Sequence, residues 1–153
     1  MEEGKVTVDG QSRPVGEPFT VIATQNPIEQ AGTYRLPEAQ LDRFLMKTSL
    51  GYPDSASTIR ILQESNERIQ VLPVIMSPDQ MAAMSDFAGT VYIAPAIADY
   101  ISRLIDATRD AVQVRLGSSV RGAIGLARAS RVRAASQGRD FVTPDDVKAL
   151  AVP

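Results

Sequence analysis

Residues Ile22–Leu45 read IATQNPIEQAGTYRLPEAQLDRFL, and this stretch decides the fold. Its first residues belong to the run Phe19–Thr24, which is short, apolar and rich in β-branched residues, as is typical of a buried parallel strand. The run ends at Gln25-Asn26-Pro27, a turn signal. A short helix is predicted over Pro37–Leu45, with Pro37 suited to its first turn. A strand, a polar turn and a helix in this order indicate an α/β arrangement.

The residues on either side add further strands. Lys5–Val8 alternates polar and apolar residues like a half-buried strand, Asp9-Gly10 is a strong turn signal, and Val15 begins a return strand, so a hairpin is predicted. Met46–Leu50 is predicted as another strand. Three or four strands with one helix leave a sheet face and an edge uncovered. Residues 1–51 are therefore expected to be part of a larger α/β domain.

The pattern changes to helices after Pro53, so we place a domain boundary near Tyr52. Each predicted helix of the region 52–153 has a start signal: Asp54 or Ser55, the capping box Ser77–Gln80, Pro95, Ser118 or Ser119, and Thr143. The expected ends of three of them are Asn66, Ala88 and Gly138. Apolar residues share one face of the helix from Pro95, namely Ile97, Tyr100, Ile101, Leu104 and Ile105.

Composition is that of a soluble globular protein, with 153 residues, a hydrophobic fraction of 44% and a charged fraction of 22%. No apolar run approaches the roughly 18 residues of a membrane span. Met1 is followed by two glutamates rather than by the basic and apolar segments of a signal peptide. We therefore expect a cytoplasmic location without membrane contact.

The chain contains no cysteine and no histidine. Their absence excludes disulfides, thiolate catalysis, a Ser-His-Asp triad and the usual zinc sites. We accordingly predict no metal-ligating residue in the chain. The remaining carboxylates, arginines, amides and hydroxyls are the groups that phosphoryl transfer uses, because its catalysis is mostly positioning and charge neutralisation.

Arginines gather between Gln113 and Asp140, although the net charge of the whole chain is −2. A nucleic-acid-binding helical module is one interpretation of this cluster. Such modules interleave aromatic residues for base stacking, and this interval contains none, so nucleic acid is disfavoured as a partner. Within the cluster, Arg128, Arg131 and Arg133 are interpreted as a solvated helix surface or an intersubunit contact.

Two motifs inside the deciding stretch, Ala-Thr-Gln-Asn-Pro and Leu-Pro-Glu-Ala-Gln-Leu-Asp-Arg-Phe, resemble the MoxR family of AAA+ ATPases. Downstream, Gly51-Tyr52-Pro53, Leu116–Arg121 and Gly138–Val147 resemble the helical lid of that family. The resemblance covers essentially the whole chain. It implies an α/β fragment of a P-loop NTPase core over residues 1–51, followed by an all-α lid, a helical bundle, over residues 52–153.

The resemblance also implies three site residues. Asn26 takes the sensor 1 position, where a neutral amide beyond a strand end orients the attacking water; by itself it is a turn asparagine. Arg43 takes the position of an arginine finger that reaches the γ-phosphate of a neighbouring subunit; by itself it is a solvated charge. Asp42 is expected to hold that arginine when no phosphate is near.

Arg121 resembles sensor 2, the lid arginine that meets the nucleotide of its own subunit. A cation in the first turn of a helix is disfavoured by the helix dipole, which favours a functional reason for it. The sequence departs from the family pattern at Val120, where proline is usual, and at Gly122, where a better helix former is usual. A looser helix start is expected from both.

The activity implied is ATP hydrolysis with Mg²⁺, in a hexameric ring. Client proteins with a von Willebrand factor A-type domain would be remodelled, or assisted in metal-cofactor insertion. The phosphate loop ending in Gly-Lys-Ser/Thr and the Mg²⁺-binding acidic strand end are absent from the sequence and would precede Met1. The chain alone is therefore expected to be inactive. The alternative, a non-catalytic helical protein-interaction domain, leaves the motifs around Asn26 and Arg43 unexplained.

Overall fold

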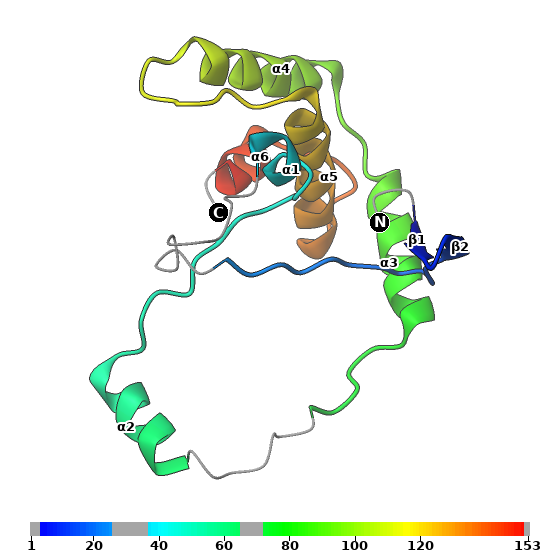
Figure 1. Cartoon of the computed structure of the whole chain (residues 1–153). Helices are drawn as coiled ribbons and strands as arrows, with labels where there is room; N and C mark the ends of the chain where they lie inside the picture. The colour runs from blue at the N-terminus through cyan, green and yellow to red at the C-terminus, as the bar shows by residue number, and fades with distance from the viewer. Residues whose placement is uncertain (1–3, 26–36, 65–71, 152–153) are drawn as a thin grey trace.

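The computed structural model describes residues 4–25, 37–64 and 72–151. Figure 1 shows a β-hairpin near one end of the chain, followed by a succession of helices. Asn26 lies outside the described residues. Within the described residues, no helix is both long and apolar enough to cross a membrane.

The hairpin pairs β1 (Lys5–Val8) with β2 (Gln11–Pro14) in antiparallel register, with Val8 opposite Gln11. Asp9 and Gly10 form the two-residue turn, and both have positive φ (51° and 75°), as the primed turns of tight hairpins require. The hairpin is thus confirmed. The return strand begins at Gln11 rather than at Val15, because a two-residue turn pairs the chain again at once.

The strands predicted at Phe19–Thr24 and Met46–Leu50 are not formed. Among the described residues only β1 and β2 pair as strands, so neither segment has a neighbouring strand to bond to. Phe19, Val21 and Leu50 are correspondingly exposed. A buried parallel strand needs partners on its edges, and the described part of the chain supplies none to these segments.

Helix α1 spans only Glu38–Leu41, shorter than the predicted helix to Leu45. Pro37 is its N-cap rather than a residue of its first turn. The chain leaves the helix at Asp42, whose N–H donates to the Glu38 carbonyl at 2.9 Å, and turns at Arg43. Asp42 and Arg43 therefore lie at the C-terminal end of this single helical turn.

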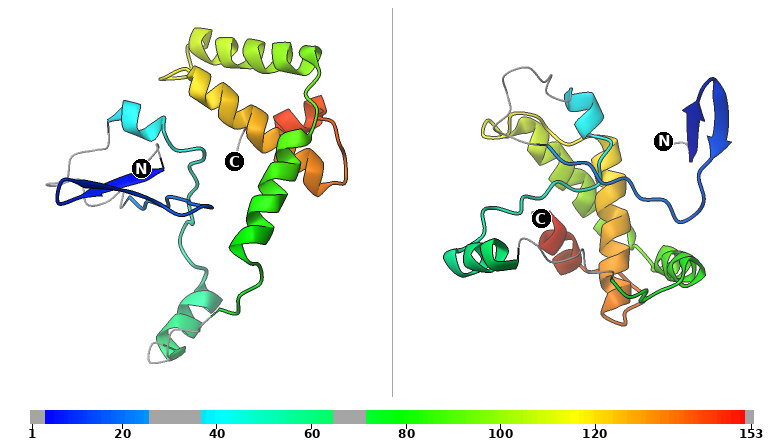
Figure 2. Two further views of the ribbon diagram at one scale, coloured as in Figure 1. Left: turned by 90° about the vertical axis from the view of Figure 1, so that its right-hand side faces the viewer. Right: turned by 60° about the horizontal axis from the view of Figure 1, so that its bottom comes forward.

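Helix α2 (Ser55–Glu64) begins where the sequence predicts. Asp54 caps it by accepting from the Ser57 N–H at 2.8 Å, and this backbone hydrogen bond lowers the pKa of Asp54. Within the described part of the chain, α2 packs against no other helix or strand. Figures 1 and 2 show it standing away from the bundle.

The bundle consists of α3 (Pro78–Thr90), α4 (Pro95–Asp110), α5 (Val120–Ser136) and α6 (Pro144–Leu150). The capping box before α3 is confirmed: Ser77 Oγ accepts from the Gln80 N–H at 3.2 Å, and Gln80 Oε1 accepts from the Ser77 N–H at 2.9 Å. Helix α5 lies at the centre and contacts α3, α4 and α6. It ends just before Gly138, as predicted.

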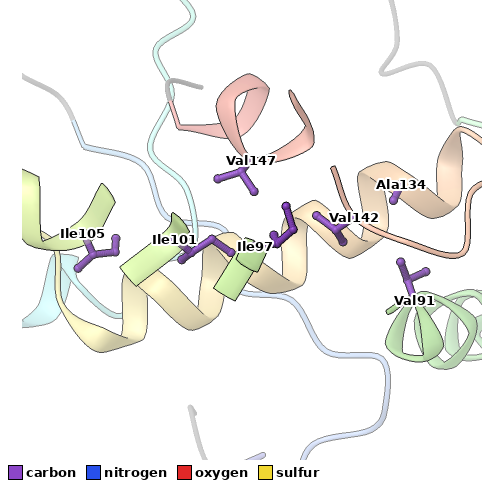
Figure 3. Packing of buried hydrophobic residues seen from close by; sticks show 7 residues of the cluster. All are labelled: Val91, Ile97, Ile101, Ile105, Ala134, Val142 and Val147. Atoms are coloured by element: carbon purple, nitrogen blue, oxygen red, sulfur yellow. The ribbon is translucent and has the colours of Figure 1, made fainter. Parts of the chain in front are cut away.

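The core of the bundle lies between α4, α5 and α6 (Figure 3). Three isoleucines of the predicted apolar face of α4 are buried, whereas Tyr100 and Leu104 are partly buried. The loops before α4 and α6 join through the Tyr92 N–H, which donates to Asp140 O at 2.8 Å, and the Val142 N–H, which donates to Tyr92 O at 3.0 Å. The buried residues of the cluster are Val91, Ile97, Ile101, Ile105, Ala134, Val142 and Val147.

A buried carboxylate fastens α6 to the end of α5. Asp146 is 2% exposed. Its carboxylate accepts hydrogen bonds from both terminal nitrogens of the Arg139 guanidinium, at 2.7 and 2.6 Å, and from the Thr143 N–H at 2.8 Å. The Arg139 hydrogen bonds, more than any other contact, hold the pKa of Asp146 well below its usual range. Arg133 Nε lies 3.6 Å from the same carboxylate, which corrects the interpretation of Arg133 as a solvated charge.

Candidate functional site

The first turn of α5 carries Arg121 on a defined cap. Ser119 Oγ accepts from the N–H groups of Arg121 at 3.1 Å and Gly122 at 3.3 Å. Two of the amides that a helix start leaves without intrahelical partners are thereby satisfied. The side chain of Arg121 remains about half exposed, at 48%. The cap thus fixes the backbone of Arg121 while its guanidinium stays accessible.

The loop before this helix is fastened to α4. Thr108 Oγ1 accepts from the Ser118 N–H at 2.9 Å, and Arg109 Nε donates to the Ser118 carbonyl at 3.0 Å. At Gly117 the loop passes so close to α4 that a Cβ atom would lie 2.6 Å from the Arg109 Cα. The position of Arg121 is therefore set by α4 as well as by its own helix.

The departures from the family pattern do not leave this helix start irregular. Val120 begins α5 directly after the Ser119 cap. Gly122 leaves room for Ser118, because a Cβ atom at that position would overlap the Ser118 hydroxyl. The expectation of a looser start is corrected by these contacts.

Two ion pairs join α1 to this region, although the partners are far apart in sequence. Arg121 Nη1 lies 3.2 Å from Asp42 Oδ2, and Arg115 Nη2 lies 2.6 Å from Glu38 Oε1. Glu38 and Asp42 are four residues apart, so their side chains share one face across the single turn of α1. Figure 1 shows α1 beside α5. The acidic face of α1 is thus docked on arginines around the start of α5.

A hollow of about 350 Å³ separates α1 from the loop it faces. Its lining comes from both sides of the contact: Glu38, Ala39 and Asp42, and Leu116, Gly117 and Ser119. Further along, Leu45 lies against α5, with its Cδ1 only 2.9 Å from where a Cβ of Gly125 would be. The segment 37–45 therefore follows the N-terminal part of α5.

The contacts of the predicted site residues differ from those expected from the sequence. Arg43 occupies the turn that follows α1 and is exposed. Asp42, expected to hold Arg43, bonds to Arg121. The pairing of α1 with the start of α5 was not predicted from the sequence. The one signal for this pairing in the sequence is the i, i+4 spacing of two carboxylates on a short helix, in a chain that also carries several arginines.

The arginine cluster is divided among separate contacts. Of its six members, Arg115 and Arg121 pair with α1, and Arg133 and Arg139 with Asp146. Four of the six cations thus have a carboxylate within the chain, so the cluster does not form one continuous basic surface. This distribution is unlike the footprint of a nucleic-acid-binding helix.

The chemistry of Arg121 fits a phosphate group. Its guanidinium is permanently charged, planar and accessible, and it already contacts an anionic oxygen that a phosphate oxygen could replace. In the ranges that the structure describes, no three acidic side chains lie close enough to hold a metal ion. Among the described residues, Arg121 therefore offers a contact suited to a nucleotide phosphate.

Comparison with known proteins matches both ends of the chain to one class. Residues 1–46 match the ATPase family associated with various cellular activities, and residues 106–153 match the AAA lid domain. A solved structure of a candidate ATPase from Cytophaga hutchinsonii superposes with a TM-score of 0.82 and 36% identity, covering 98% of this chain and 49% of that one. The predicted fold class, part of a P-loop NTPase core with an all-α lid, is thereby confirmed.

Relatives of known sequence give the family. YeaC of Bacillus subtilis is 42% identical over 99% of this chain and 48% of its own length. The chaperone MoxR1 of Mycobacterium tuberculosis is 36% identical over 96% of this chain and 41% of its own length. The protein MoxR of Methylorubrum extorquens is 30% identical over 85% of this chain and 44% of its own length. The chain spans about half the length of these relatives. It belongs to the MoxR family of AAA+ ATPases.

Proposed function

We propose that this chain supplies the nucleotide-sensing arginines of a ring-forming ATPase that remodels partner proteins. The observation that carries the proposal is the geometry of Arg121. Its backbone is capped by Ser119 and fastened to α4, while its half-exposed guanidinium reaches α1, beside the turn that bears Arg43. A fixed backbone with an accessible cation suits a residue that exchanges one anionic partner for another.

In this proposal each residue has a separate task. Arg121 contacts the phosphates bound to its own subunit, Arg43 reaches the γ-phosphate bound to the next subunit, and Asn26 orients the attacking water. The nucleotide supplies the phosphoryl group, and Mg²⁺ bound elsewhere in the complete protein offsets its charge. Residues 1–51 belong to the core and residues 52–153 to the lid.

The complete enzyme needs a phosphate-binding loop, and the printed sequence contains no Gly-Lys-Ser/Thr motif. We therefore propose that this chain alone does not hydrolyse ATP. The clients are proteins, with the von Willebrand factor A-type domain and metal-cofactor insertion as specific forms of that task. MoxR1, a relative, is described as a chaperone, which supports this class of client.

The direct test uses the full-length protein that joins this chain to a phosphate-binding loop. Arg43→Ala should reduce turnover by about 10³-fold or more, as expected for an arginine finger, while nucleotide affinity changes by less than about tenfold. The finger acts on the transition state in a neighbour's site, not on binding in its own. Normal turnover at saturation together with a large loss of affinity would contradict this role.

A non-catalytic helical interaction domain remains the second candidate. The exposed apolar side chains of α3, which include Met81, Met84 and Phe87, favour it. It gives no reason for the paired charges between α1 and the start of α5. A full-length protein that binds clients equally well with and without nucleotide would support it over the ATPase.

A further inference from the structure

We infer that Asp42 is a positioning residue, which holds Arg121 while no nucleotide is bound and competes with the nucleotide phosphate for it. The inference rests on the proposed role of Arg121. It starts from the 3.2 Å contact between Arg121 Nη1 and Asp42 Oδ2, which joins residues separated by 79 positions. A phosphate that binds Arg121 must replace or share this carboxylate.

The geometry gives Asp42 this role by holding both partners at a fixed separation. Asp42 closes the single turn of α1, with its N–H bonded to the Glu38 carbonyl at 2.9 Å. Arg121 is fixed by the Ser119 cap, and Ser118 by Thr108 and Arg109. The backbones of Arg121 and Asp42 are therefore fixed, whereas the guanidinium and the carboxylate at the ends of their side chains can change partners.

The strength of the contact suits an exchange. The side chains of Arg121 and Asp42 are 48% and 33% exposed, so water screens the attraction and the pair contributes little to stability. A phosphate carries more charge than a carboxylate and can accept two hydrogen bonds from one guanidinium. Asp42 is therefore strong enough to orient Arg121 in its resting position and weak enough to be displaced.

The neighbouring ion pair provides a matched control. Glu38 lies on α1, Arg115 lies in the loop just before α5, and their contact of 2.6 Å does not involve Arg121. If Asp42 acted only by fastening α1 to the lid, breaking the Arg115–Glu38 pair should have a similar effect. A direct competitor for Arg121 should have an effect that Glu38 does not share.

The contact also couples two sites through consecutive residues. Asp42 contacts the arginine assigned to the subunit's own nucleotide, and Arg43 is assigned to the neighbour's. Displacing Asp42 removes one support of the turn on which Arg43 sits. Nucleotide binding in one subunit would in this way reach the segment that serves the next.

The test is calorimetric titration of a non-hydrolysable ATP analogue into the full-length protein and its variants. Asp42→Asn should bind the analogue about two- to fivefold more tightly, as removal of an exposed competing ion pair predicts. Asp42→Glu, which keeps the carboxylate, should return the affinity toward that of the unmodified protein. Glu38→Gln should leave it unchanged.

Repeating the titration in an Arg121→Ala background separates the inference from the function on which it rests. Arg121→Ala should weaken binding, and Asp42→Asn should then have no further effect, because the competed group is gone. If Arg121→Ala weakens binding but Asp42→Asn alone changes nothing, the role of Asp42 is overturned and that of Arg121 stands. If Arg121→Ala leaves the affinity unchanged, the proposed role of Arg121 fails, and the inference with it. Equal tightening by Glu38→Gln would also overturn direct competition.

Discussion

At the scale of single residues, Asp146 is the charge on which the bundle depends most. It is almost completely buried and bonds Arg139, Thr143 and the start of α6. Asp146→Asn should lower the free energy of unfolding by about 3 kcal/mol, because one partner of a buried pair is left without its counter-charge. Chemical denaturation of the chain measures the change.

The adjacent Asp145 is a matched control, since it is exposed and lies 3.8 Å from Lys148 in a surface pair. Asp145→Asn should change stability by less than about 0.5 kcal/mol. Equal effects of the two substitutions would show that the buried network does not stabilise the bundle.

The same residue predicts how stability depends on pH. The pKa of Asp146 is held well below its usual value by the hydrogen bonds from Arg139. The unfolded chain therefore takes up a proton at this position near pH 4, before the folded chain does, and stability falls as the pH is lowered further. Above about pH 5 the contribution is fully present.

Denaturation midpoints between pH 6 and pH 2 test this assignment. The unmodified chain should lose stability more steeply below pH 4 than Asp146→Asn, so that the two curves converge in acid. Parallel curves over the whole range would assign the acid sensitivity to other carboxylates.

At the scale of elements, the loop before α5 packs closely against α4 at Gly117, and this contact fixes the start of α5. An added Cβ would meet the Arg109 Cα at 2.6 Å, a backbone atom that cannot turn aside. Gly117→Ala should therefore cost about 1–3 kcal/mol of unfolding free energy, as overpacking does. Gly89→Ala on α3 is the control, because nothing lies within 4 Å of its Cβ, and it should be neutral or slightly stabilising. A neutral Gly117→Ala would mean that the loop is not fastened as described.

Helix starts were the elements most predictable from sequence, because caps are local. The helix starts at Ser77, Ser119 and Thr143 depend on hydrogen bonds between residues only two or three positions apart. The prediction of strands at Phe19–Thr24 and Met46–Leu50 was wrong. Strand pairing depends on distant partners, and the described residues offer none to either segment. Propensity identified segments able to form strands and could not supply their neighbours.

For the candidate site, the sequence predicts individual residues but not the contacts between them. The motifs around Arg43 and Arg121 indicate both arginines as site residues, and that assignment stays a prediction. The bond between Arg121 and Asp42 spans 79 positions, and no local pattern encodes which of several carboxylates an arginine meets. The contacts of Asp146 are a second example. Its place in a capping box could be predicted from the sequence, whereas its pairing with Arg139 depends on how α6 packs against α5.

At the scale of the whole molecule, the proposed function requires each arginine to serve a particular subunit's nucleotide. Arg121 belongs to the bundle, which we assign to the lid, and it reaches α1 of its own chain. Arg43 follows α1 and is exposed, as a residue that acts across a subunit interface must be. A ring interface is heterologous, so each nucleotide site draws groups from two subunits. We therefore assign Arg121 to its own subunit's nucleotide and Arg43 to the neighbour's.

Mixed rings of full-length subunits test this assignment most directly. Arg43→Ala subunits and subunits disabled in the phosphate loop should each be inactive alone and recover part of the ATPase activity when mixed, because some sites then combine an intact loop with an intact neighbouring Arg43. Arg121→Ala subunits mixed with the same partner should recover nothing, since every subunit then has a defect in its own site. Recovery in the Arg121 mixture, or none in the Arg43 mixture despite verified co-assembly, would contradict the account.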